Sequence, residues 1–289
     1  MTAREAILAR VRELPTLSAS ALRLGELAQD GRSSAADFEH AIRPDPALTA
    51  NLLRFANVAY FGLRSRAESV KQAVTLLGVK RVSEIAAAAA LAPVIPPRLG
   101  GYGVNASEFW LHCVAVAVLT ERLTDELGLL RSERLFTAAV LHDVGKLAIG
   151  TSVELASGEI LGRVRRDGES LIAAERAVLG LDHGEVGGLV AEAWRLPTVA
   201  AMVARWHHAP GDAPPSADGG TIDIVHVADA LAHSMGFGAD AAELARAVDP
   251  GAEARLGIRP RSLERVASAS VEEIHQLAAL FGAPPGGRP

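Results

Sequence analysis

LFTAAVLHDVGKLAIG, residues 135–150, is the stretch that decides the fold of this chain. Its apolar residues follow the spacing of a helix that belongs in a core, and we predict one helix over Arg131–Ile149. His142 and Asp143 stand in the middle of this apolar run. A buried polar group without a partner costs roughly 2–7 kcal/mol, so these two side chains are expected to be paired, hydrogen-bonded or bound to a metal.

A second polar pair closes another apolar helix, in VAAMVARWHHAP at 199–210. Together with single residues elsewhere, the metal-capable side chains recur in this order: His112, His142, Asp143, His183, His207, His208 and Asp229. Imidazole mixed with carboxylate is the ligand set that suits zinc, iron or manganese. The sequence therefore predicts a site for a divalent transition metal.

Lys146 follows Asp143 by three residues and His142 by four, so the three side chains share one side of the predicted helix. An ammonium group there can lie beside the Asp143 carboxylate or beside a bound phosphate. We take Asp143 and Lys146 as the candidate catalytic residues.

Each of these residues alone has a simpler interpretation. A lone histidine on an apolar helix is more often a hydrogen-bonded core residue, and a lone aspartate is often a cap. The joint occurrence in apolar context favours a site over that interpretation. Three further histidines, His226, His233 and His275, are interpreted as packing or surface positions.

Composition excludes several classes of protein. Hydrophobic residues make up 49% of the 289 residues and the net charge is −5, so the chain is globular and has no basic footprint for nucleic acid or an anionic membrane. Cys113 is the single cysteine, which excludes an intrachain disulfide and fits a reducing compartment. The N-terminus has no signal-peptide core, and the most apolar run, Ile85–Ile95, is too short to span a bilayer. We expect a cytoplasmic protein.

The periodicity predicts an all-α fold in lobes. A proline- and glycine-rich break at Pro93–Val104 separates an N-terminal helical lobe, 1–95, from a metal-binding helical lobe, 105–238. C-terminal helices and a disordered tail are expected over 239–289. The helices predicted include Ala3–Glu13, Ser18–Gln29, Ala35–Ile42, Ala47–Ala56, Val70–Leu77, Lys80–Leu91, Ser107–Leu127, Gly158–Gly168, Pro197–His208, Thr221–Gly236, Asp240–Val248 and Val271–Phe281.

HDVGK at 142–146, with His112 upstream and Asp229 downstream, resembles the HD superfamily of metal-dependent phosphohydrolases. Other segments sharpen the resemblance to HDOD domains over roughly Leu14–Phe237. They are LPTL at 14–17, DPALTANLLRFAN at 45–57, Tyr60, TLLGVKRV at 75–82, LGLDHGEVGGLVAEAWRLP at 179–197 and WHHAP at 206–210.

The resemblance implies an N-terminal helical bundle packed on an HD-type bundle that holds one or two ions of iron, manganese or zinc. One ion would take His112, His142, Asp143 and Asp229. A second would share Asp143 and take His183, His207 and His208. Glu175 is implied as an accessory ligand. HDOD proteins are further implied to act in bacterial signalling by binding a partner protein or a nucleotide.

One departure separates this chain from the related HD-GYP cyclic-di-GMP phosphodiesterases. These enzymes continue after the paired histidines with a glutamate and a GYP loop, whereas this chain reads APGDAPPSADGG at 209–220. Three interpretations follow: a metal-dependent phosphohydrolase acting on a nucleotide or cyclic dinucleotide, a signalling module with an intact metal site, and a helical bundle with idle histidines. The complete ligand set and the absent loop together favour the signalling module.

Overall fold

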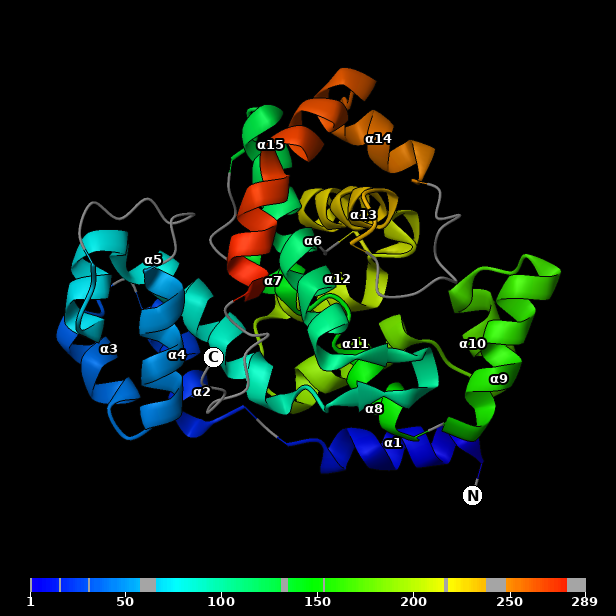
Figure 1. Ribbon diagram of the computed structural model, residues 1–289, viewed down its shortest axis with the longest axis horizontal. Helices are drawn as coiled ribbons and strands as arrows, with labels where there is room; N and C mark the ends of the chain where they lie inside the picture. The colour runs from blue at the N-terminus through cyan, green and yellow to red at the C-terminus, as the bar shows by residue number, and fades with distance from the viewer. Residues whose placement is uncertain are drawn as a thin grey trace. The chain divides into compact units, whose positions relative to one another are not determined.

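The computed structural model describes residues 2–15, 17–30, 32–57, 66–130, 135–152, 154–215, 218–237 and 248–279 (Figure 1). The predicted all-α class is confirmed in these residues. The described strands are β1 (Arg98–Leu99) and β2 (Val104–Asn105), which pair antiparallel inside the predicted break. No helix in the described part of the chain is long and apolar enough to cross a membrane.

The described residues form two compact units. The larger comprises Met1–Leu14 and Pro96–Val271, and the smaller comprises Pro15–Ile95 and Glu272–Pro289. The first helix differs from the division drawn from the sequence, which placed it in the N-terminal lobe. It belongs to the larger unit, because its buried face, with Ile7 and Val11, packs against two helices of that unit.

The smaller unit is built around one long helix, α5, which contacts three shorter helices. These elements are α2 (Ala19–Gln29), α3 (Ala35–Ile42), α4 (Pro46–Ala56), α5 (Val70–Leu91) and the short 3-10 turn η2 (Ala92–Val94). The Asp45 side chain accepts from the backbone N–H of Leu48, and Pro46 opens α4 one residue before the predicted start at Ala47. Gly78 interrupts α5 with a φ of 85°, where two separate helices are predicted.

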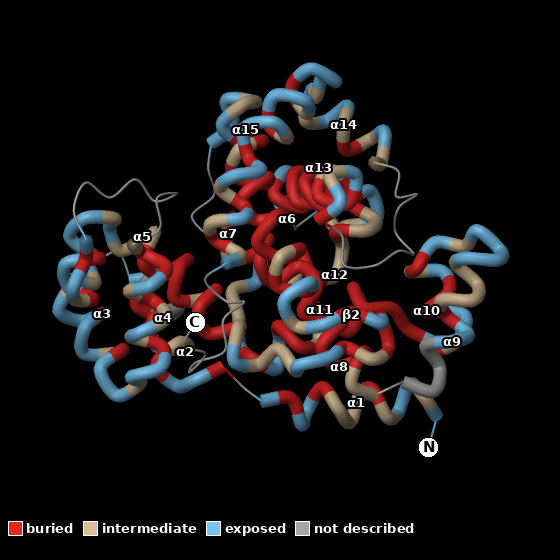
Figure 2. Tube along the Cα trace, viewed as in Figure 1, coloured by how far each residue is buried: buried red, intermediate tan, exposed pale blue. Residues whose placement is uncertain are grey.

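The larger unit carries the seven predicted ligand residues. Its elements are α1 (Ala3–Glu13), β1, η3 (Gly100–Tyr102), β2, α6 (Ala106–Glu126), α7 (Leu135–Val140), α8 (Gly145–Ser152), α9 (Glu154–Gly162), the π-helical turn η4 (Arg163–Asp167), α10 (Leu171–Leu179), α11 (His183–Ala193), α12 (Thr198–Trp206), η5 (Pro210–Asp212), α13 (Gly219–Ser234) and α14 (Pro250–Leu256). The helix α15 (Pro260–Ala279) begins in this unit. Helices α6 and α13 pack on each other and are buried along most of their length (Figure 2).

The continuous helix predicted over Arg131–Ile149 is wrong. Helix α7 ends at Val140, residues Leu141–Val144 form turns, and α8 begins at Gly145. The spacing of apolar residues does not reveal that one turn interrupts the helix, because the residues on both sides of that turn remain buried. His142 and Asp143 therefore lie in a tight turn between two helices.

Other predictions fall partly outside the described residues. Tyr60, most of the helix predicted over Asp240–Val248 and the C-terminal tail belong to this group. The helix predicted near Val271–Phe281 is found, but α15 already begins at Pro260.

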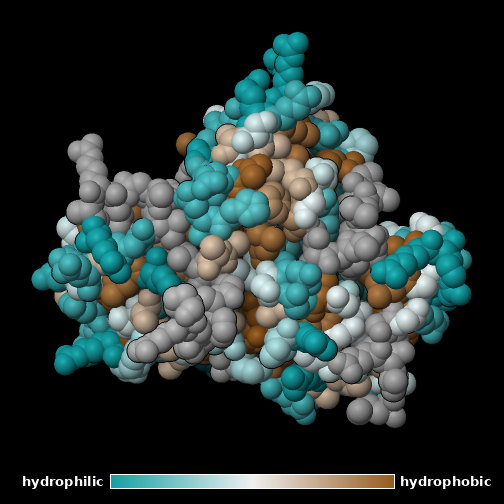
Figure 3. All heavy atoms as spheres, in the orientation of Figure 1, coloured by the Kyte–Doolittle hydropathy of each residue, from teal (hydrophilic) through white to brown (hydrophobic). Residues whose placement is uncertain are grey.

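On the face seen in Figure 3 the outer surface over α14 and α15 is mainly hydrophilic, as expected for amphipathic helices on a core.

Candidate metal centre

The fold brings all seven predicted ligand residues together within the larger unit. His112 lies on α6, His142 and Asp143 lie in the α7–α8 turn, and His183 is the first residue of α11. His207 and His208 follow α12, and Asp229 lies on α13. Five segments that are far apart in the sequence thus meet at one place.

The donor atoms form two adjacent groups. One consists of His112, His142 and Asp229, the other of Asp143, His183, His207 and His208, and within each group the donor atoms lie within 4.8 Å of one another.

Asp143 faces both groups with a different oxygen. Its Oδ2 lies 3.4 Å from His112 Nε2 and 3.5 Å from His142 Nε2. Its Oδ1 lies 3.3 Å from His183 Nε2 and 3.5 Å from His207 Nε2. This carboxylate is placed to bridge two positions, as the resemblance implies.

Four of the imidazoles are held by hydrogen bonds from Nδ1. Nδ1 of His112 donates to the Phe237 carbonyl at 3.1 Å, and Nδ1 of His142 donates to the Ala139 carbonyl at 2.7 Å. Nδ1 of His207 donates to the Ala204 carbonyl at 2.9 Å. Nδ1 of His183 donates to the Glu175 carboxylate at 2.8 Å. An acceptor on Nδ1 fixes the ring orientation and directs Nε2 toward the centre, which is the arrangement that prepares a histidine for a metal.

The donor set fits a divalent ion. Nδ1 carries the proton in His112 and His142, so their Nε2 atoms present lone pairs to each other at 3.2 Å. Two nitrogens bound to one tetrahedral ion at ordinary bond lengths would be about 3.3 Å apart. In addition, Oδ1 of Asp143 and Nε2 of His207 are buried and form no well-directed hydrogen bond to a described residue. Such atoms require a partner, and a cation satisfies them.

Burial and charge keep His142 neutral and Asp143 ionised. Burial lowers the pKa of His142 to about 3, although the neighbouring carboxylates act in the opposite direction. Burial alone would raise the pKa of Asp143, but the Lys146 ammonium and His142 hold that pKa well below its usual range. Lys146 Nζ lies 2.8 Å from Asp143 Oδ2, which is the pairing predicted from their spacing. The Lys146 side chain is buried and also lies 5.7 Å from the centre of the Tyr102 ring.

Glu175 does not lie with the donor atoms, contrary to the accessory-ligand role that the resemblance implies. It is fully buried behind His183, where Oε2 accepts from both the backbone N–H and Nδ1 of that histidine at 2.8 Å. Its other oxygen accepts from the Tyr102 hydroxyl at 2.6 Å. Tyr102 was missed in the sequence because it stands in a glycine- and proline-rich break without helical periodicity. Tyr102 and Glu175 orient His183.

The same carboxylate controls the charge of His183. Burial alone would lower the pKa of His183, but Glu175 outweighs this effect and raises it to about 10. His183 Nε2 lies 2.5 Å from His208 Nε2, and the raised pKa keeps a proton on His183 in the metal-free protein. A cation that binds there must displace the proton.

Glycine permits the close approach that assembles the second group. A Cβ on Gly145 would lie 2.0 Å from the His183 carbonyl oxygen and 2.5 Å from the Gly187 backbone nitrogen. Because no side chain separates them, α8 lies directly on the first turns of α11. This contact brings Asp143 and His183 together, and it explains the glycine of HDVGK.

A second glycine, Gly236, positions His112 indirectly, through the backbone of the next residue. Gly236 has a φ of 80° and ends α13, and the next residue, Phe237, donates its N–H back to the Ala232 carbonyl at 2.9 Å. This reversal directs the Phe237 carbonyl at His112 Nδ1. A helix cap thus becomes the support of a donor side chain.

The remaining histidines differ in their surroundings. His275 is exposed on α15. His226 is buried, and its Nδ1 donates to the His207 carbonyl at 2.6 Å, so it supports the segment that carries His207. His233 is also buried, with Nε2 3.4 Å from Asp229 Oδ1.

Cys113 is buried, and burial raises the pKa of its thiol well above the usual value, as expected for a core residue.

Access to the centre is restricted. Six of the seven residues are buried, and His208 alone among them is partly exposed.

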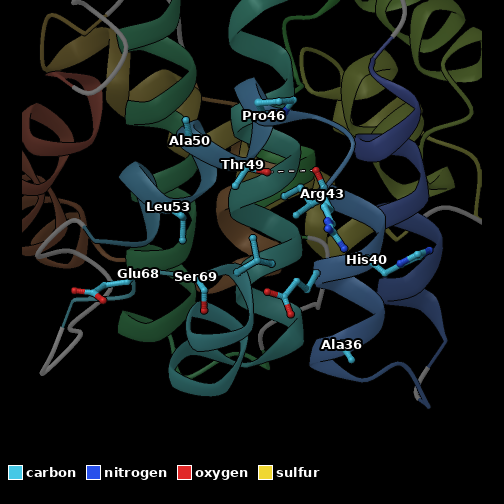
Figure 4. Close-up of a pocket in the computed structure, with 12 residues that line it drawn as sticks. Ala36, His40, Arg43, Pro46, Thr49, Ala50, Leu53, Glu68 and Ser69 are labelled. Atoms are coloured by element: carbon cyan, nitrogen blue, oxygen red, sulfur yellow. Dashed lines mark hydrogen bonds between the residues drawn. The ribbon is translucent and has the colours of Figure 1, made fainter.

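A separate pocket of about 840 Å³ opens on the smaller unit, between α3, α4 and the start of α5 (Figure 4). Its lining includes Glu39, His40, Arg43 and Glu68 around apolar residues such as Leu53. These residues form no metal-binding group with one another, so the pocket is distinct in chemistry from the histidine site.

The HDOD domain family matches residues 14–210 of the chain. No curated protein matches it. Among solved structures the chain is similar to a proposed phosphohydrolase from Shewanella amazonensis SB2B, with 23% sequence identity, a TM-score of 0.76 and coverage of 96% of this chain and 98% of that one. An HDOD domain protein of unknown function from Geobacter sulfurreducens has 21% identity and a TM-score of 0.72, over 96% of this chain and 97% of that one. A proposed signal transduction protein from Marinobacter aquaeolei VT8 has 18% identity and a TM-score of 0.68, over 97% of this chain and 66% of that one. At sequence identities of 18–23%, these similarities show that the proteins share a fold, and they show nothing about function.

Proposed function

We propose that this chain, which belongs to the HDOD domain family, is a bacterial signal-transduction module whose larger unit binds two divalent transition-metal ions. The observation that carries the proposal is the position of Asp143, with one oxygen toward His112 and His142 and the other toward His183 and His207. Iron, manganese and zinc are the ions that this ligand mixture accepts.

The burial of the donors favours a regulatory module over an enzyme. Structural metal sites are enclosed by protein, whereas catalytic sites keep a position that substrate can reach. Here the donors come from five segments and all but His208 are buried. Ions bound to them would hold those segments in one arrangement.

A module of this kind would act by binding a partner molecule. We propose a signalling protein or a nucleotide as its partner, and a net charge of −5 argues against nucleic acid or an anionic membrane. The lone buried cysteine fits a cytoplasmic, reducing location.

An active phosphohydrolase is the second candidate, and Lys146 is the observation that favours it. Its ammonium lies 2.8 Å from the bridging carboxylate, where it can also stabilise negative charge on a phosphoryl oxygen. When bound, a divalent ion supplies Lewis acidity toward such an oxygen. In this candidate Asp143 would hold the ions and Lys146 would bind the phosphoryl group of the substrate. The names of the similar solved proteins include a proposed phosphohydrolase and a proposed signal transduction protein, one for each candidate.

Metal analysis of protein purified without chelators tests the centre itself. The expected result is about two transition-metal ions per chain. A single ion overturns the two-ion centre, and a chain that retains none overturns the metal site altogether. Binding of the ions is tested independently by thermal unfolding with and without Mn²⁺. A site that forms only in the folded protein stabilises it by about 2.7 kcal/mol when free Mn²⁺ is a hundred times its dissociation constant.

A substrate panel separates the two candidates. Phosphomonoesters, nucleotides and cyclic dinucleotides are incubated with the Mn²⁺ and Fe²⁺ forms of the wild-type protein and of Asp143→Ala. Turnover by the wild type that is lost in the variant supports the phosphohydrolase. Metal binding without turnover of any compound supports the module.

A further inference from the structure

His233, which the sequence places among the packing or surface histidines, lies beside the first donor group. It lies on α13 one turn after Asp229, and its ring is almost fully buried in the larger unit. Burying an imidazole costs free energy unless its nitrogens interact with polar groups. Its surroundings therefore show what its role is.

Three histidines surround one oxygen of Asp229. His112 Nε2 lies 3.3 Å from Asp229 Oδ1, His142 Nε2 lies 3.7 Å from it, and His233 Nε2 lies 3.4 Å from it. The first two belong to the metal-binding group, in which all donor atoms are mutually close. His233 does not belong to that group, so it contacts the carboxylate from outside the donor set.

His233 also contacts the neighbouring donor ring. Its centroid lies 4.7 Å from that of His112, with the planes inclined by 43°. The ring of His112 thus lies between His142, at a centroid distance of 5.1 Å, and His233. One side chain on α13 therefore limits the movement of a donor on α6 and of a donor on its own helix.

We infer that His233 is a positioning residue for the first metal position, formed by His112, His142 and Asp229 with Asp143. Its Nε2 lies 3.4 Å from the Asp229 carboxylate and its ring lies against His112, and together these two contacts hold both donors in the geometry that binds the ion. Partners of this kind set metal affinity by about 10–100-fold in other metal sites. The inference rests on the proposed metal centre.

The chemistry of the two nitrogens defines a sharp set of variants. Glutamine places an N–H near the position of Nε2 of histidine, phenylalanine keeps the ring without any N–H, and leucine provides a second apolar replacement if the phenylalanine variant does not fold. All are made in a His208→Ala background, which weakens the second position so that one Mn²⁺ site dominates. His275→Gln, at an exposed histidine on α15, is the matched control.

Mn²⁺ affinity is measured by electron paramagnetic resonance, and folding of the metal-free variants is checked by circular dichroism. We expect His233→Phe and His233→Leu to weaken Mn²⁺ binding about 10–100-fold, and His233→Gln to remain within about threefold of the background. Unchanged affinity in folded His233→Phe or His233→Leu overturns the inference and leaves the metal centre intact. An equal loss in His233→Gln shows that an N–H at this position does not replace the imidazole, and it overturns the role assigned to the contact between Nε2 and Asp229. Absence of Mn²⁺ binding in the wild-type protein overturns the proposed function together with this inference.

Discussion

Nε2 of His112 and Nε2 of His142 face each other at 3.2 Å, while Nδ1 of each ring donates to a backbone carbonyl. Two imidazoles in this tautomer present lone pairs, which repel unless a positive charge lies between them. The carbonyls that fix the rings come from Phe237 and Ala139, in different parts of the chain. The backbone thus holds the two rings ready for a cation.

Asp143→Ala is expected to remove metal from both positions, because one carboxylate faces both donor groups. His208→Ala should lower the content by about one ion, since His208 belongs to a single group. Metal analysis after desalting measures both, with His275→Ala as the control. Full metal content in Asp143→Ala would contradict the bridging role.

Glu175→Gln is expected to weaken binding at the second position about 10–100-fold. The amide has no negative charge, and its carbonyl oxygen accepts from the two His183 N–H groups more weakly than the carboxylate does. Tyr102→Phe removes one hydrogen bond to the same carboxylate and should have a smaller effect in the same direction. Competition with a coloured chelator measures both variants. Affinity unchanged in Glu175→Gln would show that His183 does not depend on this partner.

The two positions should respond differently to pH. Glu175 overcomes the effect of burial and raises the pKa of His183 to about 10, so below that pH a cation at the second position displaces a proton. Its apparent affinity should therefore rise about tenfold per pH unit between pH 7 and 8. His142 is neutral in this range because burial lowers its pKa to about 3, so the first position should change much less. Chelator competition in His112→Ala and His208→Ala isolates the second and the first position in turn. A flat profile in His112→Ala would refute the assignment of the proton to His183.

Gly145→Ala is expected to destabilise the protein by about 3 kcal/mol and to lower its metal content. The added methyl group would lie 2.0 Å from the His183 carbonyl, so α8 and α11 must separate. Gly158→Ala is the matched control, because that glycine lies in α9 with nothing within 4 Å of the added atom. The control should gain about 0.5–1 kcal/mol from the helix propensity of alanine. Urea unfolding measures both, and equal stabilities would show that α8 can move away without cost.

The candidate site was largely visible in the sequence, since all seven ligand residues were chosen there and the fold brings them together. The family resemblance is confirmed by the match over residues 14–210. The HDVGK motif also predicted that Lys146 pairs with Asp143. The clustering of these residues has a simple physical origin: a polar residue is costly in an apolar stretch, and that cost can be recognised without coordinates.

The supporting residues were not visible in this way. Glu175 was expected among the ligands but lies behind His183, and Tyr102 carries no periodic signal. His233 was interpreted as packing, although it contacts Asp229. Each of these residues contacts a residue at least four positions away in the sequence. Helical spacing alone does not show whether a side chain points to a metal ligand, to a residue that holds that ligand, or to solvent.

The sequence by itself determined the all-α class, most helix ends and the identity of the candidate metal ligands. Helical periodicity, capping side chains and buried polar groups are local properties, and each is encoded within a few residues. The tertiary structure alone decided the turn at Leu141–Val144 and which oxygen of Asp143 faces which donor group. These features depend on how closely helices approach, as Gly145 and His183 show, and packing of that kind involves residues far apart in the chain.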